Sequence, residues 1–289
     1  MSRRTWWSAL SVWLVLAAIA AAAAPPYKAL IVDGQNGHNW KETTPVLKKL
    51  LEDSGLFAVE VATAPAKGQD MSGFRPEFKK YQVVVTNYQG EAWPQETRKD
   101  LEEYVAGGGG LVVYHFACAA FPDWKEYSKM IGLGWGRSEK DGPYVRWKDG
   151  KFVRDLSPGR KGGHGPMQPF QLVVRQPHPI VDGLPEKFMH VPDELYGWLR
   201  GPAENMEILA TAFAPAKLGG ADAHEPILMV VSYGKGRVFN TALGHTGKEL
   251  KSVAFIVTFQ RGAEWAASGK VTQKVPADFP TAEKATTRE

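Results

Sequence analysis

The sequence predicts an α/β fold in which a parallel β-sheet is covered by helices on both faces. Short apolar runs alternate with segments of helical spacing along the first half of the chain, the pattern of successive βαβ units. Several of these runs stop at a polar residue or a glycine-rich turn, as buried parallel strands do. A length of 289 residues, with 44% hydrophobic and 23% charged residues, is enough for a sizeable core.

The first predicted units follow one another closely. Lys28–Asp33 is an apolar run ending in a carboxylate, so we expect a strand there. Lys41–Ser54 has its leucines on one helical face, and Gly55 supplies a natural C-terminal stop. Pro94–Ala106 is expected to be a helix with proline near its first turn and glycines after its last. The other strands of this half are expected at Phe57–Ala62, Tyr81–Thr86 and Leu111–Tyr114.

The alternation stops between Ile131 and Pro169, a stretch rich in Gly, Pro, Lys and Arg. We predict a long loop or insertion near the site, because long loops in compact domains are often functional. Glu249–Ala267 is expected to be the closing helix, and the polar chain beyond Gly269 to be loosely ordered. The strands between are expected at Phe170–Arg175, Glu207–Ala212, Pro226–Ser232 and Arg237–Ala242.

The N-terminus has the pattern of an export signal, which we place at residues 1–24. Arg3 and Arg4 precede an apolar segment, Trp6–Ile19, and Ala20–Ala24 offers the small residues of a cleavage site. An uncleaved membrane anchor is the alternative. With cleavage we expect a periplasmic or secreted protein that has no stable insertion in the membrane.

Charge and cysteine content exclude some classes of protein. The net charge of +4 falls to about +2 once the two signal arginines are removed, too little to indicate nucleic acid as a partner. The one cysteine, Cys118, leaves no internal disulfide, and we expect it to be a buried small hydrophobe. Gly107–Gly110 is not a phosphate loop, since no Gly-Lys-Ser/Thr follows, and the chain has no Gly-x-Ser-x-Gly elbow.

Three histidines follow predicted strands. His38 lies in the loop after the first strand, His115 ends the run GGGGLVVYH, and His245 follows the strand near its LGHTG segment. Because ligands bind outside the carboxyl ends of parallel strands, we expect these side chains to share a cleft. Histidine titrates near neutral pH and suits proton transfer. Each one could equally be a hydrogen-bonded structural residue.

A fourth element is the segment HVPDELYGW at residues 190–198. Adjacent Asp193 and Glu194 point in different directions, so only one can easily enter a cleft. Asp193 could instead cap a turn or helix. Histidines with a carboxylate could also hold a divalent metal, although the chain has no HExxH spacing. We therefore leave the metal open, since the same groups can transfer protons without one.

Seven pieces of the chain together resemble the ThuA-like (trehalose utilisation) family, within the class I glutamine amidotransferase-like superfamily. They lie in order between Lys28 and Val271, and their combination carries the resemblance. The pieces are KALIVDGQNGHNW, YQVVVTNYQG, GGGGLVVYHFACAAF, QPHPIVDGLPEKF, HVPDELYGW, SYGKGRVFNTALGHTGKEL and RGAEWAASGKV. The resemblance implies a flavodoxin-like three-layer sandwich with a mainly parallel sheet, as one domain over residues 25–271 and a polar tail over 272–289.

The resemblance also bears on function. In related amidotransferases the turn after the glycine-led strand carries a nucleophilic cysteine, whereas here that place is taken by His115, so we do not expect glutamine hydrolysis. The family is associated with sugars such as trehalose and with keto-sugar intermediates. It implies an exported protein of carbohydrate metabolism that acts on a glycoside or keto-sugar by acid–base chemistry, as a hydrolase or isomerase. The alternatives are a non-catalytic sugar-binding or scaffold protein and a metal-dependent hydrolase.

The expected site residues follow from these arguments together. We predict a small carbohydrate as the ligand and leave the oligomeric state open. The predicted catalytic residues are His115, His245 and Glu194, and the predicted substrate-binding residues are His38, Asp193, Tyr196 and the aromatic Trp40.

Overall fold

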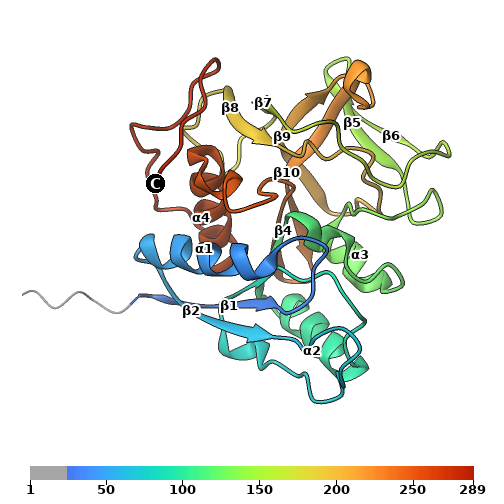
Figure 1. Cartoon of the computed structure of the whole chain (residues 1–289), viewed down its shortest axis with the longest axis vertical. Helices are drawn as coiled ribbons and strands as arrows, with labels where there is room; N and C mark the ends of the chain where they lie inside the picture. The colour runs from blue at the N-terminus through green and yellow to red at the C-terminus, as the bar shows by residue number, and fades with distance from the viewer. Residues whose placement is uncertain (1–24) are drawn as a thin grey trace, which may run out of the picture.

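The structure is a computed structural model that describes residues 25–289, so the predicted signal peptide lies outside the described residues. It is a mixed α/β fold built on one large twisted sheet (Figure 1). The strands are β1 (Tyr27–Asp33), β2 (Phe57–Thr63), β3 (Val83–Thr86), β4 (Gly110–Tyr114), β5 (Tyr144–Lys148), β6 (Lys151–Asp155), β7 (Gln168–Val174), β8 (Lys187–Asp193), β9 (Met206–Ala214), β10 (Ala223–Tyr233) and β11 (Gly236–Thr241).

One half of the sheet is parallel and is covered on both faces. Its strands lie in the order β2-β1-β3-β4-β11, and every neighbouring pair is parallel. β3 and β4 are buried along their whole length, which explains their unbroken apolar sequences. Helices α1 (Trp40–Asp53) and α4 (Val253–Ser268) contact each other on one face, while α2 (Gln95–Ala106) and α3 (Lys125–Ile131) contact β11 from the other. Among the described residues no helix is both long and apolar enough to cross a bilayer.

The other half of the sheet is antiparallel. β11 pairs with β10, and the sheet continues through β9, β7 and β8 with antiparallel neighbours throughout. The sheet is therefore mixed, and the prediction of a mainly parallel sheet was too simple. β10 and β11 are joined by a two-residue turn between Tyr233 and Gly236, and Gly234 there has a φ of 59°. Such a hairpin leaves no room for the crossover helix that a parallel pair needs.

Most predicted elements are confirmed, with ends displaced by a few residues, but three segments differ. The stretch Ile131–Pro169 contains the β5–β6 hairpin, which contacts β10, so it is more than a loop. No strand was predicted at the position of β8. The tail beyond Gly269 is docked rather than loose, because Phe279 is buried against Phe188 and backbone hydrogen bonds join it to β8 and α4.

Candidate functional site

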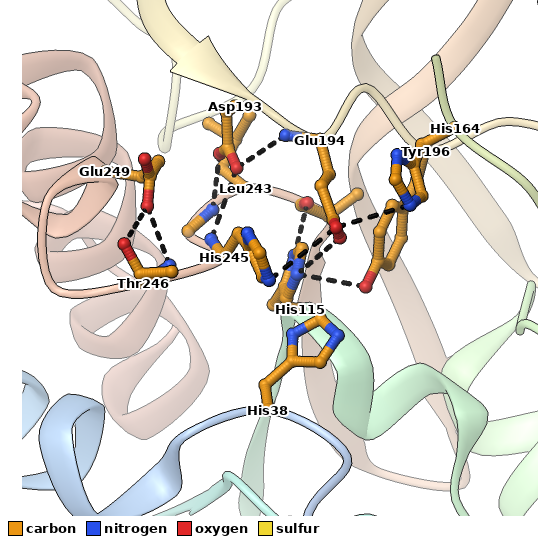
Figure 2. Close-up of polar contacts among 12 residues, drawn as sticks. His38, His115, His164, Asp193, Glu194, Tyr196, Leu243, His245, Thr246 and Glu249 are labelled. Carbon is orange, nitrogen blue, oxygen red and sulfur yellow. Dashed lines mark hydrogen bonds and ion pairs between the residues drawn. The ribbon is translucent and has the colours of Figure 1, made fainter. Parts of the chain in front are cut away.

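Four histidines surround one carboxylate at the edge of the sheet, as Figure 2 shows. β1, β4 and β11 end at this edge, so the segments that follow them meet there. Glu194 enters from the opposite side, directly after β8. The histidines come from the loop before α1 (His38), the end of β4 (His115), the segment between β6 and β7 (His164) and the loop after β11 (His245).

His115 is the most enclosed member of this histidine cluster. Its side chain is 1% exposed, and its φ of 46° lies in a region that residues other than glycine seldom adopt. Nδ1 lies 2.8 Å from the carbonyl oxygen of Ala242, which can only accept, so Nδ1 carries the proton. The Tyr196 hydroxyl then donates to Nε2 at 2.9 Å. Both ring nitrogens are engaged, which holds the strained turn and the imidazole in place.

Glu194 is the hub of the cluster. Its Oε2 lies 3.5 Å from Nε2 of His115, and its Oε1 lies 3.3 Å from Nε2 of His164 and 3.6 Å from Nε2 of His245. Burial favours a raised pKa, yet the contact with His115 and the other imidazoles outweighs it and lowers the pKa of Glu194 below its usual range. The carboxylate is therefore ionised at neutral pH.

Asp193 faces away from the cluster and is fully buried. Its Oδ2 accepts hydrogen bonds from the backbone of Gly244 at 2.7 Å and from Nε2 of His190 at 2.9 Å. Its Oδ1 accepts from the backbone nitrogens of Glu194 and His245, at 2.7 and 3.2 Å. Burial acts to raise the pKa of Asp193, but these bonds, with His190 foremost, lower it overall. We predicted a substrate-binding residue; the structure encloses this side chain and joins it to the backbone of the loop that carries His245.

The ring of His38 lies next to the rings of Phe116, His115 and His245. Its ring stacks on Phe116 with centroids 4.5 Å apart, and lies 4.9 Å from His115 and 4.5 Å from His245. Burial, followed by the neighbouring imidazoles, lowers the pKa of His38 to about 4, so the ring is neutral at pH 7. Its backbone nitrogen donates to Asn36, which fixes the loop before α1.

His245 and His164 form the open rim. Their side chains are 27% and 38% exposed, whereas that of Glu194 is 10% exposed. His164, which is flanked by glycines, was not among the predicted site residues. A backbone hydrogen bond from Gly197 to Gly163 brings its segment beside Tyr196. These two histidines are the members of the cluster that a solute can reach most easily.

The two predicted aromatic residues have different surroundings. Tyr196 is almost fully buried, and its ring stacks on His115 with centroids 4.4 Å apart. Trp135, which was not among the predicted site residues, lies 4.8 Å from the Tyr196 ring. Trp40 is half-buried and lines a cavity of about 590 Å³ together with Gly37, the neighbour of His38. A second cavity, of about 700 Å³, lies between α1, α4 and the tail, and neither cavity is lined by these histidines.

The cluster offers two kinds of chemistry. Imidazoles next to an ionised carboxylate can take up and release protons at an exposed edge. The same atoms can also act as metal ligands, because one atom each from His38, His115 and Glu194 lie within 4.8 Å of one another. Cys118 is buried, as expected, and burial raises the pKa of its thiol to about 11, so it is no nucleophile.

Comparison with known proteins agrees with this architecture. A ThuA-like protein of Parabacteroides merdae is 47% identical, with a TM-score of 0.89, over 91% of this chain and 98% of that one. A ThuA-like protein of Bacteroides uniformis shares the fold, at 21% identity and a TM-score of 0.58, over 89% and 97% of the two chains. No curated protein matches this chain. The family model described as ThuA, trehalose utilisation, matches residues 28–266. By this match and by its likeness to the Parabacteroides protein, the chain belongs to the ThuA family.

Proposed function

We propose that this protein is an exported enzyme of carbohydrate metabolism that acts on a glycoside or keto-sugar by proton transfer. The observation that carries the proposal is the His245–Glu194 pair. A partly exposed imidazole lies with Nε2 3.6 Å from the oxygen of a carboxylate that is nearly buried. The description of the family as trehalose utilisation supports a sugar as the substrate. Export to the periplasm or beyond follows from the proposed signal at residues 1–24.

His245 is the group to which we assign the proton transfer. Its side chain reaches solvent, while Asp193 holds its backbone nitrogen. The ionised Glu194 orients the ring and stabilises its protonated form, as a carboxylate does for a catalytic histidine. In an isomerisation, His245 takes a proton from a carbon beside the ketone and returns it to the product, so no electrons are exchanged. His115, whose ring nitrogens are both engaged, acts by holding Tyr196 and Glu194.

The cavity beside His38 is the proposed place for the sugar ring. Trp40 offers an aromatic face there, and Gln35, Gln89 and Glu91 offer polar groups on the same walls. Small-molecule sites combine such an apolar wall with a few placed polar groups. The strand order β2-β1-β3-β4-β11 further supports a flavodoxin-like frame, whose ligands bind at this edge.

The test compares His245→Asn with His224→Asn, a matched change of a half-buried histidine on β10, outside the cluster. Turnover would be measured on trehalose, simple glucosides and their 3-keto derivatives. We expect kcat/KM to fall by roughly 10²–10⁴-fold in His245→Asn only. Equal activity in both variants would remove His245 from the mechanism. If sugars bind by calorimetry yet no product forms during long incubation, the protein is a non-catalytic sugar binder and the proposal is wrong.

A further inference from the structure

We infer that His38, His115 and Glu194 are the ligands of one divalent transition-metal ion. This inference deepens the proposed function and rests on it for the role of the ion, though not for its binding. One ligand atom from each of the three residues lies within 4.8 Å of the others. The three come from separate places along the chain, the loop before α1, the end of β4 and the end of β8, and they converge on one point (Figure 2).

The separation between Glu194 and His115 fits shared coordination better than hydrogen bonding. Oε2 of Glu194 lies 3.5 Å from Nε2 of His115. A hydrogen-bonded nitrogen and oxygen lie about 2.7–3.2 Å apart. Two ligands of one tetrahedral ion, each about 2.1 Å from it, lie roughly 3.4 Å apart. The His115–Glu194 pair already has that spacing, and a ligand atom of His38 lies within 4.8 Å of both.

The orientation of His115 is that of a metal ligand. Metal-bound histidines usually donate their second ring N–H to a backbone carbonyl or a carboxylate, which fixes the tautomer. Nδ1 of His115 makes such a bond to the Ala242 carbonyl oxygen at 2.8 Å. The lone pair is therefore on Nε2, which lies 3.5 Å from Oε2 of Glu194. The Tyr196 hydroxyl donates to that lone pair at 2.9 Å, so the ion must displace this hydrogen bond.

Glu194 has only imidazoles as possible cationic neighbours. Glu225 pairs with Arg146 at 2.9 Å, but within the described residues no lysine or arginine lies within 4 Å of Glu194. Nδ1 of His38 is buried and has no hydrogen-bond partner there. A buried carboxylate without a permanent positive charge beside it is costly, and so is an unpaired buried nitrogen. A divalent cation between them would satisfy the carboxylate.

The donor set indicates the class of metal. Two imidazoles and one carboxylate suit zinc, manganese or ferrous iron and leave positions open for a substrate. His245 and His164 stay outside the triad and remain free to exchange protons. At the open positions the ion would polarise a sugar carbonyl or hydroxyl, which makes the neighbouring proton easier for His245 to remove.

The binding test uses the mature chain freed of metal by a chelator, titrated with Zn²⁺, Mn²⁺ and, without oxygen, Fe²⁺ in a calorimeter. We expect one of these ions to bind at one per chain. His38→Asn, His115→Asn and Glu194→Gln should each weaken its binding by roughly 100-fold or more, since even changes outside the ligand set cost about 10–100-fold. His178→Asn and His224→Asn are the controls and should bind as the unaltered chain does. Equal binding in ligand and control variants, or less than half an ion per chain, would overturn the inference.

Tyr196→Phe distinguishes coordination from a general loss of structure. It removes the hydroxyl that competes for Nε2 of His115, so we expect metal binding as tight as before or tighter. A loss as large as that in His115→Asn would contradict the assigned ligand set. Thermal midpoints, measured without metal, show whether each variant is folded.

The metal inference and the proposed function can fail separately. Sugar turnover that persists in metal-free protein, with no ion bound, would end the inference and leave the proposed function standing. Stoichiometric binding with no change in any sugar would end the proposed function and leave the metal site standing.

Discussion

Asp193 and Glu194 are adjacent in the chain, yet their carboxylates contact different parts of the loop that carries His245. Asp193 accepts hydrogen bonds from the backbone of Gly244 and His245, at 2.7 and 3.2 Å. Glu194 approaches the imidazole of the same His245, with Oε1 3.6 Å from Nε2. One carboxylate therefore positions the backbone of the histidine, and the other lies beside its ring.

Asp193→Asn should destabilise the protein and also disturb the site. Asparagine keeps one acceptor but brings an amide N–H against the backbone donors and His190. We expect the free energy of unfolding to fall by about 2–4 kcal/mol, as for a broken buried pair. Urea denaturation measures this, with Asp123→Asn, an exposed carboxylate on a turn, as the control. Equal midpoints for the two variants would show that Asp193 positions nothing.

Trp40→Ala should weaken sugar binding more than it slows the chemical step. Trp40 lines the cavity beside His38, and none of the proposed proton-transfer groups lines that cavity. We expect KM to rise by roughly 10-fold, a loss of about 1.4 kcal/mol of binding, with kcat changed little. Steady-state kinetics on the best sugar would measure both. Trp147→Ala, a half-buried tryptophan on β5, is the matched control; a KM that rises equally there would exclude a specific role for Trp40.

The stability of the fold should decrease in mild acid, partly through His178. Burial lowers the pKa of His178 from 6.5 to about 4. As the pH falls from about 6.5 towards 4, the unfolded chain takes up a proton that the folded chain does not, so the free energy of unfolding decreases across this window. Below about 4 this contribution is constant.

His178→Asn keeps an acceptor for the Ile180 backbone and should remove this contribution. Urea midpoints at several pH values would show it as a shallower decline than in the unaltered chain. Identical slopes would mean that His178 takes up its proton equally in the folded and unfolded states.

The C-terminal tail should contribute to stability. Phe279 is buried against Phe188, with ring centroids 5.1 Å apart. Phe279→Ala is expected to lower the free energy of unfolding by about 2–3 kcal/mol, near the transfer energy of a buried aromatic side chain. Phe213→Ala removes a ring that is 44% exposed and should cost about 1 kcal/mol or less. Thermal unfolding of both variants checks this, and a similar loss in each would mean that the tail is not docked in solution.

The histidines after β1, β4 and β11 could be predicted because parallel strands share one direction. A polar residue at the carboxyl end of any such strand lies at the same edge of the sheet, regardless of the conformation of the loops. His164 and Trp135 could not be found in this way, since they lie in the segment between α3 and β7, outside the parallel strands. The position of His164 depends on the contact of Gly163 with Gly197, and that of Trp135 on the contact of Gly134 with Arg200. Both contacts join residues distant in sequence.

The sequence by itself determined the parallel half of the sheet, the helices that cover it and the edge to which His38, His115 and His245 belong. These follow from local periodicity and strand direction, which need no knowledge of distant contacts. Tertiary structure alone decided that Glu194 rather than Asp193 faces the histidines, that His115 is locked at both nitrogens, and that the tail is docked. Each of these depends on which distant groups satisfy a buried polar atom or fill an apolar surface, and that choice is made only when the chain packs.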